Sequence, residues 1–351
     1  MRKDRTGNYF EDFRLGMRIR HAAPRTLTEG DRSLYIGLTG SRTVLGTAET
    51  NAQRLGYERR PLEDLLVFNV AFGKTVPDVS LNAVANLGYA DVRFTADVYP
   101  GDTLLVESEV IGLKENSNRR SGVVYVRSTS NNHHGLEVLT WSRWVMVHKR
   151  DHNAMCAEPV VPAMDAVVSP ARLPRRQYPI FVREVVEMTG VEDLWDDYAV
   201  GERIDHPGAM TVNDSDHSIA TRLYQNTAKA HFDGFTMAAA GGRLVYGGHI
   251  ISLCKALAYD GLENALSIAA INSGSHVNPT FAGDTVACAT MVLEKIELDV
   301  SHVGALRLRM IGVKNAAAAS IVFPIAEQGR QAHDPSVVLD LDYTIVIPRK
   351  I

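Results

Sequence analysis

Residues 10–31 read FEDFRLGMRIRHAAPRTLTEGD, and residues 195–216 read WDDYAVGERIDHPGAMTVNDSD. The two stretches align without a gap, and seven of the twenty positions from residue 12 to residue 31 are then identical. The identical pairs are Asp12/Asp197, Gly16/Gly201, Arg18/Arg203, Ile19/Ile204, His21/His206, Thr26/Thr211 and Asp31/Asp216. Self-similarity at a fixed offset is the mark of an internal repeat. The chain is therefore predicted to contain two copies of one domain.

The repeat continues along the chain and carries secondary-structure patterns with it. YPGDT at residues 99–103 matches FAGDT at residues 281–285, and alternating apolar and polar residues follow each motif. Such alternation predicts antiparallel strands. The strands are expected at residues 104–115, 122–132 and 136–148 in the first copy, and at 286–297, 304–315 and 337–348 in the second.

Each copy also contains one apolar run too long for an ordinary strand, at residues 61–75 and 247–259. These runs are predicted as buried helices. The fold class is therefore α+β, with a short lead strand, a helical segment, one long helix and about four antiparallel strands in each copy.

The predicted domains are residues 1–150, an N-terminal copy, and residues 191–351, a C-terminal copy. Residues 151–190 are proline-rich and little periodic, so they are predicted as an extended linker across the surface. Its prolines include Pro159, Pro162, Pro170 and Pro174. Its arginines, Arg172, Arg175 and Arg176, are interpreted either as solvated charges or as contacts to a phosphate.

Composition excludes several classes of protein. The 351 residues are 45 % hydrophobic and 22 % charged, and the formal net charge is −4, so no overall basic field favours nucleic acid or anionic lipid. The N-terminal MRKDRTGNYFEDF has no apolar core, and no apolar run has membrane-spanning length. The three cysteines, Cys156, Cys254 and Cys288, show no metal-ligand spacing. We expect a cytoplasmic protein that binds neither nucleic acid nor membrane.

The candidate reactive stretch is residues 224–251, YQNTAKAHFDGFTMAAAGGRLVYGGHII. A helix beginning near Asp214 delivers Asn226 and His231, and Gly247 and Gly248 open the long apolar helix, whose first N–H groups have no intrahelical partner. A histidine, an amide and free N–H groups suit the addition or removal of water beside a thioester. The alternative interpretation is a hydrogen-bonded loop histidine beside a tight glycine turn.

The first copy lacks these groups. The repeat register places Ser41 opposite Asn226, Gly46 opposite His231 and Leu65 opposite Gly248. We therefore expect the first copy to form a wall or a binding cleft for the substrate.

Three stretches carry a family resemblance: YIGLTGSRTVLGTAETNAQRLGY, VRFTADVYPGDTL and QNTAKAHFD with the following GGH. They resemble the MaoC-like dehydratases, or (R)-specific enoyl-CoA hydratases, over nearly the whole chain, which implies a double hot-dog fold. The resemblance implies reversible hydration of an α,β-unsaturated acyl-CoA without a metal or redox cofactor, since CoA is part of the substrate. Mesaconyl-CoA, giving β-methylmalyl-CoA, is the expected substrate. Alternatives are another enoyl-CoA hydratase, a hot-dog thioesterase or a non-catalytic acyl-CoA-binding subunit.

In this family the motif Gly-Asp-x-Asn-Pro-Leu-His supplies an aspartate and a histidine that activate one water. The matching stretch here keeps His231 but has Asn226 in place of the aspartate. The amide of an asparagine cannot accept a proton as a carboxylate can. Either His231 is the only base and Asn226 orients the water, which we prefer, or a nearby carboxylate such as Asp233 takes part. The resemblance makes the N–H of Gly248 the oxyanion donor.

The remaining candidates are basic residues and histidines. A C4 substrate with a free carboxylate needs a cation in its pocket, and Arg243 is the first candidate and Lys229 the second, unless both are solvated. His249, His276 and Gly247 are expected near the pocket, although either histidine could be core. Lys74, Arg93 and Arg143 are possible contacts to CoA phosphates. No metal site is expected, because no Cys, Asp or Glu motif accompanies His133 and His134, and a homodimer is expected.

Overall fold

The computed structural model describes residues 7–155, 158–174, 176–178, 182–323 and 333–350. The first copy contains η1 (Phe10–Asp12), β1 (Arg18–Arg20), β2 (Arg25–Thr26), α1 (Glu29–Thr39), α2 (Val44–Thr47), α3 (Glu49–Arg54), α4 (Asp64–Thr75), η2 (Val76–Ser80), β3 (Ala83–Arg93), β4 (Thr103–Glu115), β5 (Ser121–Asn131) and β6 (Glu137–His148). The second contains η4 (Trp195–Asp197), β7 (Arg203–Thr211), α6 (Asp214–Leu223), η5 (Lys229–His231), α7 (Gly234–Met237), η6 (Ala238–Ala240), α8 (Gly247–Leu257), β8 (Ser267–His276), β9 (Thr285–Glu297), β10 (Val303–Lys314), η7 (Ala318–Ser320) and β11 (Val337–Pro348).

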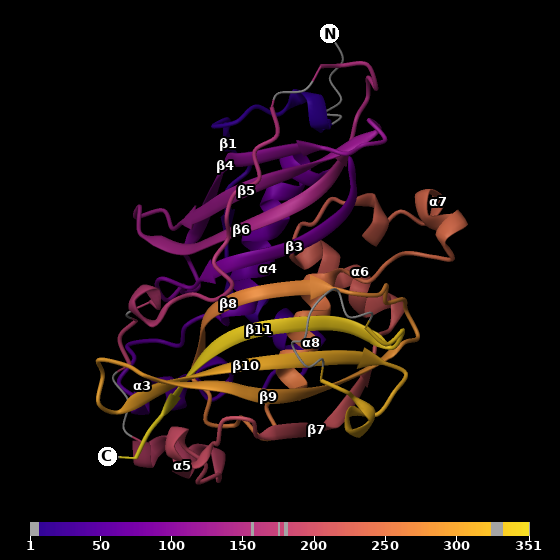
Figure 1. Cartoon of the computed structure of the whole chain (residues 1–351). Coiled ribbons are helices and arrows are strands. Elements are labelled where there is room, and N and C mark those ends of the chain that lie inside the picture. Colours follow the sequence, from indigo (N-terminus) through magenta and orange to yellow (C-terminus); the bar gives the residue numbers. More distant parts are fainter. Residues whose placement is uncertain (1–6, 156–157, 175, 179–181, 324–332, 351) are drawn as a thin grey trace.

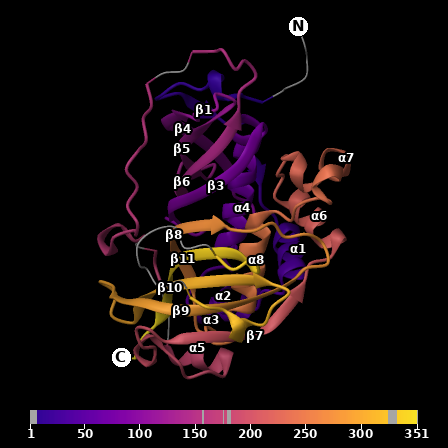
Figure 2. The same ribbon diagram turned by 45° about the vertical axis from the view of Figure 1, so that its right-hand side comes forward.

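Both copies contribute to one continuous antiparallel sheet, in the order β1-β4-β5-β6-β3-β8-β11-β10-β9-β7, with β2 paired to β4. Figure 1 shows the strands of the first copy above those of the second, with α4 and α8 behind them. Figure 2 shows α1, which is not labelled in Figure 1, next to α6 and on the same side of the sheet as α8. The architecture is thus two sheet-wrapped helices side by side.

The residues shared by the two repeats make matching hydrogen bonds. His21 Nε2 lies 2.8 Å from Ser108 Oγ, and His206 Nε2 lies 2.8 Å from Thr290 Oγ1. The carboxylates of the identical pair Asp12/Asp197 accept bonds from the backbone N–H three residues earlier, at 2.9 and 3.0 Å. The two histidines are buried polar groups that need such partners, whereas the two aspartates lie nearer the surface and satisfy the N–H groups at the start of a short helical turn.

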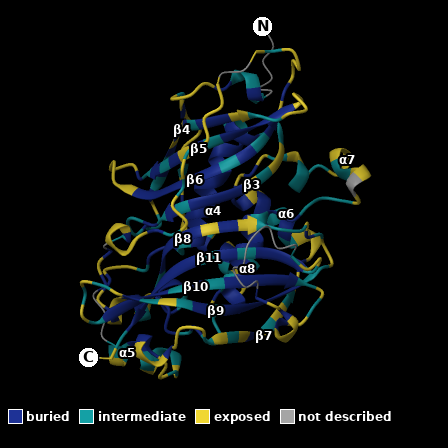
Figure 3. Ribbon diagram, in the orientation of Figure 1, coloured by how far each residue is buried: buried dark blue, intermediate teal, exposed yellow. Residues whose placement is uncertain are grey.

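The two long helices pack against each other in the main core. Both α4 and α8 belong to the largest apolar cluster, and they are among the most buried elements in Figure 3. Between them the amide Nδ2 of Asn69 donates to Gly248 O at 3.2 Å and to Ser252 Oγ at 3.0 Å. One side chain of the first copy therefore fixes the start of the second copy's helix.

The sheets of the two copies join where β3 pairs with β8. Tyr89 lies opposite Gly274 in this ladder, and a Cβ atom at Gly274 would come within 2.2 Å of the Tyr89 ring. Glycine is needed there because the tyrosine ring covers the neighbouring strand.

The segment between β6 and η4 differs in part from the predicted extended linker. It contains the turn η3 (Pro170–Arg172) and the helix α5 (Val182–Thr189). Arg176 is 8 % exposed and pairs with Asp64 and Asp97 of the first copy, so the interpretation as a solvated charge is wrong for this residue. Arg172 pairs with Asp91 and Asp165, and Arg175 lies outside the described residues. Cys156 also lies outside them, while Cys254 and Cys288 are buried and free.

None of the helices in the described ranges combines the length and the apolar character that crossing a bilayer requires.

Candidate active site

A cavity of about 640 Å³ lies between the two copies. Its walls include Phe68, Phe72, Ser80, Tyr89 and Arg143 from the first copy, and Asn226, Lys229, His231, Tyr246, Gly247, Gly248 and His276 from the second. The structure therefore brings together His231, Asn226 and Gly248, the three groups singled out for chemistry, with Lys229 and Gly247 beside them. The first copy forms one wall, as expected from its missing base.

His231 ends η5, and its hydrogen bond orients the ring. Nδ1 lies 3.0 Å from the carbonyl oxygen of Leu244, which can only accept, so Nδ1 carries the proton. Nε2 is then left as the basic nitrogen. Burial lowers the pKa of His231 below the ordinary histidine value, so the ring is neutral at neutral pH. The ring also packs edge-on against Tyr246, with centroids 5.4 Å apart.

Asn226 follows Gln225, whose φ of 51° places it in the left-handed region and turns the chain after α6. The Asn226 side chain is 5 % exposed, and its Oδ1 accepts a bond from Ala228 N at 3.0 Å. This bond fixes the amide, and its Nδ2 has no partner among the described residues. The amide is thus held in place with a donor left for a water or a substrate.

Two glycines open α8 at the cavity. His249 N and Ile250 N both donate to Tyr246 O, at 2.9 and 3.3 Å, whereas the N–H groups of Gly247 and Gly248 have no backbone acceptor among the described residues. A Cβ at Gly247 would lie 2.5 Å from the His276 ring. The helix therefore presents free N–H groups, at the positive end of its dipole, to the space that His231 faces.

Asp233 lies elsewhere. It caps α7, where Oδ1 accepts from Phe235 N and Thr236 N and Oδ2 accepts from Thr236 Oγ1 at 2.7 Å. Asp233 does not line the cavity, and no Asp or Glu appears among the described residues that do. This arrangement favours the account in which His231 is the only base.

The other predicted binding residues are dispersed. Arg243 lies outside the lining of this cavity; its guanidinium pairs with Asp214 and donates to Ser218 Oγ at 2.8 Å. Lys229 is exposed at the cavity wall. His249 is 1 % exposed and lies in the core rather than on the wall, and burial lowers its pKa to about 4. A role of Arg243 in binding a substrate carboxylate stays a prediction without a contact to support it.

A second cavity of about 720 Å³ adjoins the first, and Asn226 lines both. Three basic side chains contribute to its wall: Lys74, Arg222 and Arg243. The cavity with these three basic side chains therefore meets the cavity that contains His231 at Asn226.

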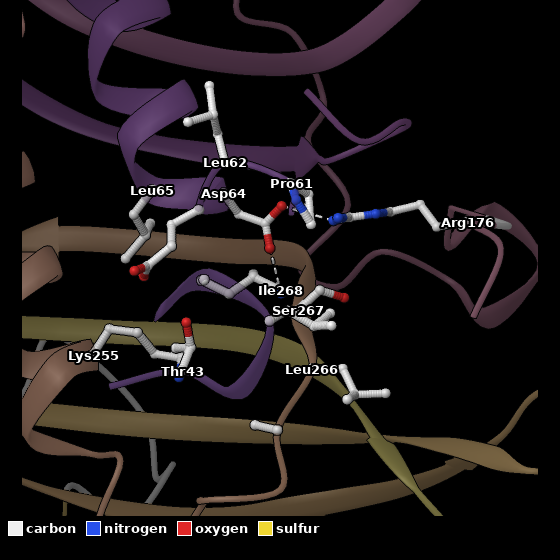
Figure 4. A pocket seen from close by; sticks show the side chains of 14 residues that line it. Thr43, Pro61, Leu62, Asp64, Leu65, Arg176, Lys255, Leu266, Ser267 and Ile268 are labelled. Atoms are coloured by element: carbon white, nitrogen blue, oxygen red, sulfur yellow. Dashed lines mark hydrogen bonds and ion pairs between the residues drawn. The ribbon is translucent and has the colours of Figure 1, made fainter. Parts of the chain in front are cut away.

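The equivalent place in the first copy is closed. Gly46 and Leu65, the counterparts of His231 and Gly248, line a cavity of only about 40 Å³ together with Arg176 and Lys255 (Figure 4). In Figure 4 Asp64 and Arg176 point toward each other, and their ion pair measures 2.7 Å. A space of this size holds a water molecule rather than an acyl chain.

Asp102 joins His133 and His134, although the sequence spacing gave no sign of it. Their possible ligand atoms lie within 4.8 Å of one another. His133 Nδ1, however, accepts a bond from Thr103 N at 3.2 Å, so in this arrangement that nitrogen is not available to a cation.

Sequence reasoning gave Tyr89 no role and Arg143 only a possible contact to CoA phosphates, whereas both residues line the cavity that contains His231. The signal for Arg143 was an arginine between two tryptophans, Trp141 and Trp144, in a strand with little other charge.

The comparisons with known proteins agree with this fold. A solved structure of a MaoC domain protein dehydratase from Chloroflexus aurantiacus is 48 % identical, with a TM-score of 0.91 and coverage of 100 % of both chains. A Mycobacterium tuberculosis protein described as having a double hot-dog fold is 24 % identical, with a TM-score of 0.79 over 98 % of this chain and 99 % of that chain. Fold and site thus define a MaoC-like dehydratase, a hydro-lyase built as a double hot dog.

The particular family follows from closer relatives. The mesaconyl-CoA hydratase family model matches residues 2–319. The chain is 50 % identical to a β-methylmalyl-CoA dehydratase from Chloroflexus aurantiacus, covering 99 % of each chain. It is 48 % identical to a mesaconyl-CoA hydratase from Cereibacter sphaeroides, covering 99 % of this chain and 100 % of that one. The chain belongs to the mesaconyl-CoA hydratase family.

Proposed function

We propose that this protein reversibly adds water to mesaconyl-CoA and gives β-methylmalyl-CoA. The observation that carries the proposal is the placing of a neutral His231, with its basic Nε2 available, in one cavity with the free N–H groups of Gly247 and Gly248. The names of the 48–50 % identical relatives support the substrate.

In the hydration direction, His231 Nε2 takes a proton from a water molecule held by the Asn226 amide. The water oxygen forms a bond to C3 of the enoyl group, and the electron pair of the double bond moves toward the thioester oxygen. The N–H of Gly248 stabilises this oxyanion. The imidazolium then returns the proton to C2, so the net change is one water added and the histidine is restored.

The neighbouring cavity suits the rest of the thioester. Its basic side chains, Lys74, Arg222 and Arg243, offer charge for the phosphates of CoA, and its junction with the first cavity at Asn226 gives a path for the pantetheine arm. The reaction as written needs no metal or redox cofactor, and activity that survives exhaustive treatment with EDTA would support that part of the proposal.

The test follows two signals separately after mixing the protein with mesaconyl-CoA: loss of the enoyl-thioester absorbance and release of free thiol. Loss without thiol is the expected result. Thiol release would instead indicate a thioesterase, and binding with neither signal would indicate a non-catalytic acyl-CoA-binding subunit. The homodimer stays a prediction, which light scattering behind size-exclusion chromatography tests.

A further inference from the structure

Arg143 is a buried cation with almost no polar partners. It lies on β6, is 0 % exposed, and belongs to the wall of the 640 Å³ cavity that His231 also lines. Its Nε and Nη1 have no hydrogen-bond partner, and Nη2 reaches only Ser80 Oγ, at 3.4 Å. The guanidinium rests on the Phe72 ring, with Cζ 4.3 Å from the ring centre.

No acidic residue faces this guanidinium from the described cavity wall. Elsewhere in the chain the buried Arg176 meets two carboxylates, Asp64 and Asp97, so this fold does pair its buried arginines where no ligand is expected. An uncompensated buried charge strongly destabilises a protein. An arginine kept in this state is best explained by an anion that arrives with a ligand.

The cavity places this cation and the base at opposite ends of one aromatic wall. The His231 ring contacts Tyr246 at 5.4 Å, Tyr246 contacts Phe72 at 6.3 Å, and Phe72 carries the Arg143 guanidinium. A short acyl group along this wall can therefore react near His231 while its far end meets Arg143. Arg143 also lies opposite Tyr89 in the β3–β6 ladder, and the Tyr89 hydroxyl is 3.5 Å from His276 Nε2.

We infer that Arg143 binds the free carboxylate at the far end of the acyl group and so selects dicarboxylic acyl-CoA thioesters over neutral ones. This inference rests on the proposed function. Nε and Nη1 have no partner and Nη2 makes only the 3.4 Å contact to Ser80 Oγ, so the guanidinium can offer Nη2 together with either Nε or Nη1. Each of these pairs gives two parallel N–H donors, which fit a carboxylate. The specificity residue thus comes from the first copy and the base from the second.

Binding is tested first, because it does not depend on turnover. Succinyl-CoA and butyryl-CoA have four-carbon acyl groups without a double bond and differ in the far carboxylate. Kd is measured by calorimetry for the full-length wild type and for Arg143→Met, which keeps the side chain's length and removes its charge. We expect the wild type to prefer succinyl-CoA, and the variant to lose roughly 10²- to 10³-fold in affinity for it while binding butyryl-CoA within about threefold of wild type.

Turnover is tested with mesaconyl-CoA and tiglyl-CoA, in which a methyl group replaces the carboxylate. Arg143→Met is expected to lower kcat/KM for mesaconyl-CoA by roughly 10²- to 10³-fold and to change tiglyl-CoA hydration little. Arg127→Met, an exposed arginine on the neighbouring strand β5, is the matched control and should alter neither value. Arg143→Lys should recover only part of the loss, because an ammonium group cannot form the fork.

Equal losses on the charged and the neutral thioester, or no loss on either, would overturn the assignment of Arg143. So would a selective loss of succinyl-CoA affinity in Lys229→Met or Arg243→Met that is absent in Arg143→Met. If the wild type binds succinyl-CoA through Arg143 but does not hydrate mesaconyl-CoA, the proposed function fails and the carboxylate site stands. Retained melting temperature in Arg143→Met shows that the variant is folded, and a rise is expected because an unpaired buried charge is removed.

Discussion

The hydrogen bond between His231 Nδ1 and Leu244 O decides which nitrogen of the ring is basic. Leu244 comes thirteen residues later in the chain, after α7 and η6, so the loop must close before the tautomer is fixed. The sequence has Asn226 where the family motif has its aspartate, so the proposed mechanism assigns proton transfer to this one ring.

His231→Ala is expected to lower kcat by about 10²- to 10⁴-fold, because the proposed general base is removed. Asp233→Asn should keep most of the activity, since an asparagine can still cap α7 and Asp233 does not line the cavity. Steady-state hydration of mesaconyl-CoA measures both. The opposite pattern would move the chemistry from His231 to Asp233.

The pH profile of kcat/KM should have an acid limb with its midpoint below 6.5, the ordinary histidine value, because burial lowers the pKa of His231. Above that midpoint the ring is neutral and the rate is unaffected by this group; below it, the rate falls by about tenfold per pH unit. Rates measured in a constant-ionic-strength buffer series test this. A midpoint above 6.5 would contradict a buried neutral base.

Single residues show where sequence reasoning ends. The candidate base and the glycines were found because loop chemistry and helix starts leave local patterns, and the structure places them in one cavity. The interpretation of Arg176 as a solvated charge was wrong, and the burial of Arg143 was not predicted, because the surroundings of both residues are remote in sequence. Arg176 meets Asp64 and Asp97, which precede it by 112 and 79 residues. Strand β6 is buried on both faces over most of its length, so alternation gave no sign of Arg143's burial.

At the scale of elements, α8 begins where two copies touch. A Cβ at Gly248 would lie 2.0 Å from Asn69 Oδ1, on α4. The predicted need for a small residue at Gly248 therefore has a packing cause in addition to a chemical one: the helix start cannot approach α4 otherwise.

Gly248→Ala should lower the free energy of unfolding by about 1–3 kcal/mol through overpacking and should also lower kcat, because the free N–H groups move. Gly37→Ala is the matched control. It lies in the helix α1 with nothing within 4 Å of its Cβ, so it should stabilise the protein by about 0.5–1 kcal/mol. Urea denaturation monitored by circular dichroism measures both, and a neutral Gly248→Ala would contradict the close packing.

Helices and strands whose apolar residues follow a clear pattern along the sequence were predicted well. The alternating run at residues 337–348 is β11 (Val337–Pro348), and the apolar run at 247–259 contains α8. A fourth strand was expected in each copy, but the sequence analysis gave no bounds for β3 or β8. Glycine and polar residues interrupt the alternation of apolar residues in both strands. Those interruptions are what the junction between the copies requires, as Gly274 under Tyr89 shows.

At the scale of the whole molecule, the halves share a core and a sheet, and parts of the linker pack against them. Its first part pairs with the first copy through Val160 and Leu113, and Val168 N donates to Asn272 Oδ1 of the second copy. Asp165 and Ala166, between these anchors, are exposed.

A protease site inserted at Asp165–Ala166 should therefore be cleavable without separating the halves. We expect the cleaved protein to elute as one species and to keep its activity within about twofold, since the shared apolar core remains. Size-exclusion chromatography followed by an activity assay of the pooled peak tests this. Separation into two inactive fragments would show that the covalent link is required.

Acid should destabilise the folded chain. Burial lowers the pKa of His249 and of His276 to about 4, so between about pH 6.5 and 4 the unfolded chain binds protons that the folded chain does not. Stability is complete above that range and falls as the pH drops. The expected loss from pH 7 to pH 5 is about 2 kcal/mol per ring.

Urea unfolding at the two pH values measures this loss, and His249→Leu should remove about half of it. Equal stability at pH 7 and pH 5 would contradict the buried neutral state of these rings.

Because both copies line the cavity, the proposed reaction divides two tasks between them. In the proposed reaction, water is activated by residues within 226–248, whereas the cavity wall that carries Tyr89 and Arg143 is built from β3 and β6. Substitutions in those two strands can therefore redirect the enzyme toward acyl groups of other size or charge without disturbing the proton transfer. Substrate specificity could therefore be engineered in the first repeat while the residues for proton transfer in the second repeat are kept unchanged.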